Sequence, residues 1–292
     1  MTKPVLLALA SVLAGSSASA ADGPGDALAI MNKVAANTME ATEARRQYVY
    51  KQKVRASLVR TTGPIRRKET REYTVVPQKT TTDKILVSFS GEYRDGKQMV
   101  PYTQPSAKDK GDQGDRRLIQ ELVEGLVNAK NSRDGIPHEL FPLGSEELGY
   151  YRFSLKGEAD VHERHTYDIV FEPADLQDLC IHVGEDDQNP CHQWKGEVWI
   201  DTQEFQPVRI ETQLAKAVPW GVRVFLGTNV HQLGFSIDYQ RVAENVWFPA
   251  AYGTEFSLDV LWGYKRTITL SMESSGFQRT DADSTIHYDL QR

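Results

Sequence analysis

The sequence predicts a mainly β protein of the α+β class, built on a single, strongly curved antiparallel sheet. Such a sheet is an incomplete β-barrel, and about two helices are expected to pack in its concave mouth. Two observations predict this fold. Apolar and polar residues alternate with a period of two along most of the chain, and only two long segments have helical periodicity. With 292 residues, 40% of them hydrophobic, the chain is long enough to bury a full core.

The N-terminal residues predict a secretory signal peptide over residues 1–20, followed by one domain over residues 21–292. Lys3 precedes a short apolar run, and small residues lead to Ala20. A charged start, an apolar stretch too short to span a bilayer and a small-residue cleavage site are typical of exported proteins. The alternative is a buried N-terminal helix. Ser16 stands where a lipoprotein signal would need its acylated cysteine, so we expect a protein without a lipid anchor.

Two segments are expected to form helices. The first runs from Asp26, a residue type that can cap a helix, to about Arg45, with apolar residues at helical spacing. The second begins after Asp115 and carries one apolar stripe. The stripe consists of Leu118, Ile119, Leu122, Val123, Leu126 and Val127.

Most of the remaining chain alternates as half-buried antiparallel strands do. The clearest segments are residues 48–58, 85–90, 151–156, 167–172, 208–214, 233–239, 255–262 and 267–272. Turn residues separate strands where the fold needs them. Asp95 and Gly96 suit a tight hairpin, and residues 243–245 predict a second one. The absence of a Pro-, Gly- or Ser-rich linker from the sequence favours one domain.

The number of strands predicts the curvature of the sheet. About ten strands at ~4.8 Å spacing make a sheet roughly 45–50 Å wide, whereas two helices of ~10 Å diameter cover about 20 Å. A flat apolar face of this size would aggregate. The sheet is therefore expected to curl around the helices. Its concave face then either encloses a cavity for an apolar ligand or is packed solid.

The candidate surface for an apolar ligand lies on three strands near the C-terminus. Large apolar side chains occupy matching phases there, and hairpin-connected antiparallel strands project one phase to one side. These residues are Phe235, Ile237, Phe256, Leu258, Val260, Trp262, Ile268 and Leu270. The ligand alternative places the opening of the cavity near Trp262.

The two cysteines predict a disulfide between Cys180 and Cys191, because a cysteine pair in an exported protein is usually oxidised. The alternative is a zinc site that also uses His182 and His192. Tetrahedral zinc sites usually draw on C-x₂₋₄-C or H-x₃₋₅-H spacings, and neither spacing is present, so no metal is expected.

One group of side chains could carry catalysis. It comprises His162, His165, Asp160 and Asp168, but in a strand positions three apart point to opposite faces, so neither a catalytic nor a metal site is predicted. The segment Gly91–Gln98 nearly matches a phosphate-binding loop, yet it lacks the final Ser or Thr and a following helix. No cofactor is therefore expected. The net charge of −6 argues against nucleic acid as a partner.

Two hairpins resemble those of the outer-membrane lipoprotein-sorting and lipoprotein-carrier (LolA/LolB-like) superfamily. The segment Gly196–Asp201, followed by Pro207–Glu211, is similar to one hairpin of that superfamily. The pair Asp238-Tyr239, followed by Val246–Pro249, is similar to the next. The similarity covers roughly residues 150–272, and the N-terminal half agrees in its layout of signal peptide, helix and long strand.

The resemblance implies an incomplete barrel with helices in its mouth that holds acyl chains of lipids or lipoproteins in the periplasm. It implies a carrier rather than an enzyme, with envelope membrane proteins as further partners, and we expect a monomer. An enzyme or a structural envelope protein on the same scaffold is the alternative. Superfamily members hold a closed state with an arginine on an early strand, and no motif chooses here among Arg45, Arg46, Arg55 and Arg60.

Overall fold

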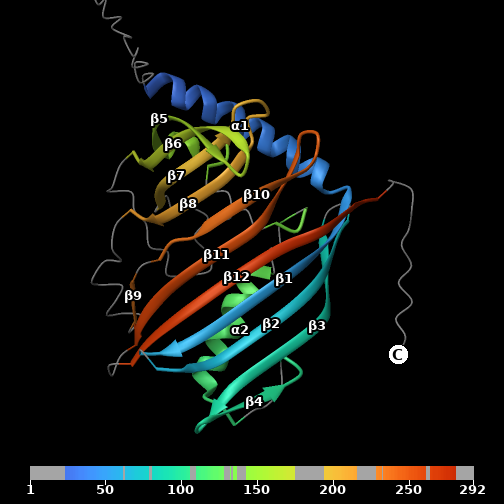
Figure 1. Ribbon diagram of the computed structural model, residues 1–292, viewed down its shortest axis with the longest axis vertical. Coiled ribbons are helices and arrows are strands. Elements are labelled where there is room, and N and C mark those ends of the chain that lie inside the picture. The colour runs from blue at the N-terminus through green and yellow to red at the C-terminus, as the bar shows by residue number, and fades with distance from the viewer. Residues whose placement is uncertain are drawn as a thin grey trace, which may run out of the picture.

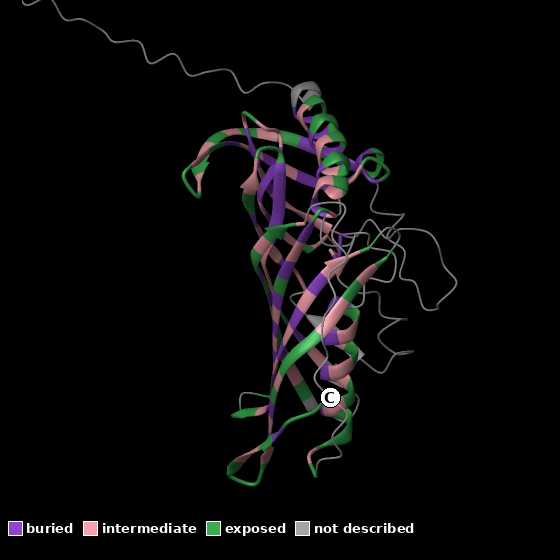
Figure 2. Cartoon of the chain, turned by 90° about the vertical axis from the view of Figure 1, so that its right-hand side faces the viewer, coloured by how far each residue is buried: buried purple, intermediate pink, exposed green. Residues whose placement is uncertain are grey.

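The computed structural model describes residues 24–61, 63–78, 81–105, 110–127, 132, 134–136, 143–174, 194–215, 228–231, 233–260 and 264–280. In these residues twelve strands form one antiparallel sheet, with two α-helices on the same side of it (Figures 1 and 2). The strands are β1 (Tyr48–Arg60), β2 (Ile65–Pro77), β3 (Thr82–Asp95), β4 (Gln98–Tyr102), β5 (Tyr151–Val161), β6 (Arg164–Pro173), β7 (Trp194–Asp201), β8 (Pro207–Leu214), β9 (Thr228–His231), β10 (Ser236–Ala243), β11 (Val246–Val260) and β12 (Tyr264–Arg279).

The order of the strands across the sheet is β4-β3-β2-β1-β12-β11-β10-β8-β7-β6-β5, and β9 pairs with β11. The two edge strands β4 and β5 do not pair with each other, so the described sheet stays open. This architecture confirms the predicted class of an incomplete, mainly β barrel. The first long strand, β1, lies beside the last, β12, which joins the N-terminal hairpins to the C-terminal strands (Figure 1).

The two helices confirm the predicted helical segments. Helix α1 (Pro24–Arg45) crosses one end of the sheet and packs against β5 and β11, whereas α2 (Gln113–Val127) lies along β1 and β2 (Figure 1). A short 3₁₀ turn (Leu148–Tyr150) precedes β5. Within the described residues, neither α1 nor α2 has the long, nearly uncharged apolar stretch that a membrane-spanning helix requires.

The main core lies between the sheet and the helices. Met31 and Val34 of α1 and Ile119 and Val123 of α2 are almost fully buried in the same cluster as the inward residues of the strands. Alternation in β1 follows the prediction, because every second residue from Tyr48 to Leu58 is buried. The predicted hairpin turn at Asp95 and Gly96 is present, and so is the turn at residues 243–245 between β10 and β11.

Strand β2 is the main element that the sequence pattern did not predict. Its inward positions include Arg67, Glu69 and Arg71, so hydrophobicity does not alternate along it. Burial does alternate, because these three side chains face the interior. The boundary expected at Ala20 and the start of the mature domain lie outside the described residues and stay predictions.

Candidate functional site

The predicted apolar surface lies on the inner side of the sheet, facing the helices. Five of its residues, Phe235, Ile237, Phe256, Ile268 and Leu270, are buried members of the main core cluster. Leu258 is partly buried and packs against the same cluster. Phe256 and Ile268 are direct partners in neighbouring strands, so their side chains share one face.

For two residues of the predicted surface the structure does not describe the side chain. The side chain of Val260, at the end of β11, and the whole of Trp262 lie outside the described residues. The predicted opening near Trp262 therefore stays a prediction. The predicted disulfide, Cys180 with Cys191, also lies outside the described residues.

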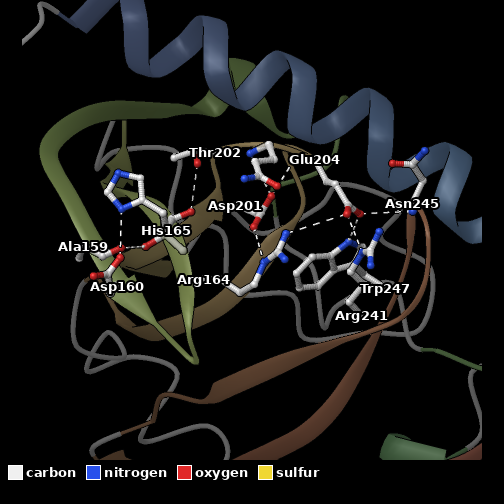
Figure 3. A network of polar contacts seen from close by, with 12 residues as sticks. Ala159, Asp160, Arg164, His165, Asp201, Thr202, Glu204, Arg241, Asn245 and Trp247 are labelled. Atoms are coloured by element: carbon white, nitrogen blue, oxygen red, sulfur yellow. Dashed lines mark hydrogen bonds and ion pairs between the residues drawn. The ribbon is translucent and has the colours of Figure 1, made fainter.

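Hydrogen bonds and ion pairs link the turns at one end of the sheet to one another (Figure 3). Glu204, in the turn between β7 and β8, accepts a hydrogen bond from the indole Nε1 of Trp247 at 2.8 Å. The other oxygen of the same carboxylate lies 2.6 Å from Nε of Arg241. Asp201 accepts from Nε of Arg164 at 2.7 Å, and the Arg164 guanidinium lies 5.5 Å from the centre of the Trp247 ring.

The same turn also holds helix α1. The side-chain amide of Asn37 donates to the carbonyl of Glu204 at 2.8 Å, and Gln206 donates back to the carbonyl of Asn37 at 3.0 Å. Lys33 places its ammonium 4.4 Å from the ring centre of Phe205. These contacts bridge about 170 residues of sequence, so they fix α1 over the sheet.

A buried ion pair and a hydrogen bond hold the C-terminal end of α1 in place. Arg45 is 6% exposed, and its Nε lies 2.7 Å from Oδ2 of Asp134. Its Nη1 also donates to the carbonyl of Trp247 at 3.0 Å. The hydroxyl of Tyr50 donates to the carbonyl of Asp134 at 2.9 Å, and burial raises the pKa of Tyr50 well above its usual value. Of the four arginines left open by the sequence, Arg45 is the one that the structure buries.

The inner face of β2 carries a row of buried charges. Glu69 accepts a hydrogen bond from Nη2 of Arg71 at 2.7 Å and another from the hydroxyl of Tyr102 at 2.6 Å. The guanidinium of Arg67 lies 5.0 Å from the ring centre of Tyr102. Burial is the first cause that raises the pKa of Tyr102, and the hydrogen bond to Glu69 adds to it. The negative charge of Glu69 is therefore compensated within the row by Arg71 and Tyr102, as a buried charge requires.

Next to this row, Lys84 of β3 reaches toward β1. Its Nζ donates to Oε1 of Gln52 at 3.1 Å. Burial lowers the pKa of Lys84 to about 8, and the negative charge of Asp134 opposes this shift. Gln52 is 1% exposed, and in the described part of the chain its Nε2 has no hydrogen-bond partner.

The four residues of the possible catalytic group do not come together. His162 contacts Asp238 at 2.8 Å, whereas Asp168 lies 3.4 Å from Lys156. Only His165 and Asp160 are partners, with Nδ1 and Oδ1 3.0 Å apart. Among the described residues no group of three or more His, Cys, Asp and Glu side chains could hold a metal ion.

We predict that the pKa of His165 lies above its ordinary value. Hydrogen bonds from its ring to Asp160 and then to Glu158 raise its pKa. This interaction stabilises the fold below the unfolded-state pKa of about 6.5, and the stabilisation is lost as the pH rises through the higher folded-state value. Titration by NMR should show that Asp160→Asn and Glu158→Gln each lower this pKa. Asp238→Asn, which alters the partner of His162, should leave it unchanged, and an equal effect of all three variants would contradict the assignment.

The fold of this chain was compared with those of solved structures, and its sequence with family models and curated proteins. No family model and no curated protein sequence matches the chain. A putative outer membrane lipoprotein-sorting protein domain from Vibrio parahaemolyticus is 10% identical, with a TM-score of 0.37, and the match covers 90% of this chain and 95% of that one. A DUF1329 family protein from Desulfovibrio piger is 11% identical, with a TM-score of 0.38, 89% of this chain and 95% of that one covered.

A LolA superfamily protein from Nitrosomonas europaea is 10% identical, with a TM-score of 0.32, and the match covers 87% of this chain and 94% of that one. The fold assignment itself rests on this chain's own strand order and helix placement.

Proposed function

We propose that this protein binds and carries an apolar ligand, either a lipid or the acyl chains of a lipoprotein, on the inner face of its sheet. The continuous apolar surface of that face carries the proposal. Buried side chains from β5 to β8, from β10 to β12 and from β1 join those of both helices in one cluster. A surface that spans so many strands can accept a long, flexible, apolar molecule between the sheet and the helices.

The open sheet suits such a role. Its edge strands β4 and β5 are unpaired with each other, so its curvature can change without loss of a strand pair in the described sheet. Helix α1 covers one end and α2 covers β1 and β2, and both are joined to the strands by side-chain contacts rather than by strand pairing. Movement of either helix would expose apolar surface to a ligand.

The cellular setting is part of the proposal. The predicted signal peptide over residues 1–20 supports a periplasmic location as part of this proposal. The resemblance to lipoprotein-sorting and carrier proteins favours acyl chains as the ligand and envelope membrane proteins as donor and acceptor. We propose that it acts there as a monomer that needs no cofactor.

Two measurements test the proposal. Native mass spectrometry of protein purified from its own host should detect a co-purifying lipid, and a fluorescent fatty-acid probe should bind to the delipidated protein with saturation. A protein that carries no lipid and binds no probe would overturn the carrier function. Stoichiometric metal in place of lipid would favour the enzyme alternative.

A substitution at Leu258 should weaken probe binding more than it weakens the fold. Leu258 is partly buried at the margin of the apolar face, and a buried leucine contributes about 1.5–3 kcal/mol. Leu258→Gln is therefore expected to lower probe affinity about tenfold. The matched control is Val87→Gln, because Val87 on β3 is 59% exposed and lies away from this margin. Equal affinities of the two variants would exclude the Leu258 margin from the binding surface.

A further inference from the structure

The inner face of the sheet changes its chemistry between β1 and β2. On the β12 side of β1 the inward residues Ile268, Leu270 and Met272 are apolar. On β2 and β3 the inward positions between Arg67 and Lys84 hold three positive charges, those of Arg67, Arg71 and Lys84, and one negative charge, that of Glu69. Lys84 pairs with Val75, eight residues along β2 from Arg67, so it stands apart from the Arg67–Glu69–Arg71 row, and its polar neighbours are Gln52 and Asp134.

The neighbours of Lys84 do not neutralise it. The carboxylate of Asp134 raises the pKa of Lys84, against the larger effect of burial, and Oδ2 of Asp134 is bonded by Arg45 at 2.7 Å. Its Oδ1 accepts from Ser132 and from the backbone N–H of Ile136. This carboxylate is therefore already compensated. The ammonium of Lys84 has three donors, and among the described residues its hydrogen bond goes to a neutral amide oxygen, Oε1 of Gln52.

The amide of Gln52 supplies a second donor at the same place. Its Oε1 accepts from Lys84, which turns the amide so that Nε2 is the free end. Gln52 is 1% exposed, and its Nε2 has no partner within the described ranges. A buried donor left without a partner costs about 1–3 kcal/mol, so an acceptor at this position would be favoured.

We infer that Lys84 and Gln52 together bind the oxyanion of an amphipathic ligand, the carboxylate or phosphate of a lipid headgroup. This inference rests on the proposed carrier function. The ammonium and the amide N–H would donate to the same anionic group, as charge-assisted hydrogen bonds do. In the register of β1 and β12, Gln52 pairs with Ser274, and the next inward pair is Val54 with Met272. A headgroup at Gln52 thus places its acyl chain over the apolar part of the same face.

The experiment compares oleate, its uncharged methyl ester and inorganic phosphate as competitors of a fluorescent fatty-acid probe. The native protein should bind oleate about 10- to 100-fold more tightly than methyl oleate, which is the effect of one charged hydrogen-bonded contact. Lys84→Met and Gln52→Leu should each reduce this preference, and Lys84→Arg, which keeps the charge, should retain much of it. The matched control is Lys53→Met, because Lys53 lies on the outer face of β1 and pairs with Glu72.

The outcomes separate the inference from the carrier function. Equal affinity of the native protein for oleate and methyl oleate would overturn the inference and leave the carrier function standing. Failure of both to bind would overturn the carrier function. Inorganic phosphate binding that requires Lys84, without an oleate preference, would identify a site for free phosphate and overturn the headgroup assignment. A melting temperature of Lys84→Met at or above that of the native protein would show that the lost preference does not come from misfolding.

Discussion

Replacement of Arg45 by methionine should lower the free energy of unfolding by about 3–5 kcal/mol, because it leaves a buried carboxylate without its counter-charge. Arg45 and Asp134 are 6% and 3% exposed, and their contact is 2.7 Å long. The substitution also removes the bond from Nη1 to the carbonyl of Trp247. Chemical denaturation of the variant and the native protein measures the difference.

The exposed pair Arg55 with Glu273 provides the matched control. It links β1 to β12 at 2.6 Å, but its side chains are about half exposed. Such surface pairs contribute about 0–1 kcal/mol, so Arg55→Met should be almost neutral. The double variant of Arg45→Met with Asp134→Leu should recover part of the loss, since it removes both buried charges. Equal losses from Arg45→Met and Arg55→Met would contradict the buried ion pair.

Local sequence pattern could predict those elements whose hydrophobicity follows their burial. The helices ending at Arg45 and beginning near Gln113, and the alternation of β1, belong to this class. Strand β2 does not, because its inward positions hold Arg67 and Glu69. These side chains are tolerated inside because Tyr102, 33 residues after Glu69, provides a partner. Such compensation depends on tertiary contacts, and a single strand's pattern cannot reveal it.

Part of the candidate site could likewise be predicted from the local sequence pattern, and part of it could not. The alternation of apolar and polar residues could by itself place Phe256 and Ile268 on one inner face, because directly paired residues of antiparallel strands point to the same face of the sheet. It could not show that Glu204 meets Trp247, or that Lys84 reaches Gln52, since these contacts depend on register and on bonds between distant residues. The pairing of β1 with β12 is likewise a property of the whole topology, and it puts the polar and apolar parts of the inner face side by side.

Trp247 should be the aromatic residue on which the docking of α1 depends most. It is 2% exposed, belongs to the motif that resembles the lipoprotein carriers, and is bonded through its indole N–H to Glu204. The same turn residue holds Asn37 of α1. Trp247→Ala is expected to lower the free energy of unfolding by about 3–5 kcal/mol, as large-to-small core substitutions do. Faster amide exchange in α1 would show that the helix loosens with it.

Trp247→Phe separates the hydrogen bond from the packing, because the smaller ring remains and the N–H is lost. A hydrogen bond to a charged group contributes about 1.5–3 kcal/mol. Since Glu204 keeps its contact with Arg241, we expect the loss to lie near the lower value. Trp199→Phe on β7 is the control, and it should cost about 1 kcal/mol, the typical effect of a point substitution. If both variants melt alike and α1 exchanges at the native rate, the bond to Glu204 does not hold the helix, and packing alone must do so.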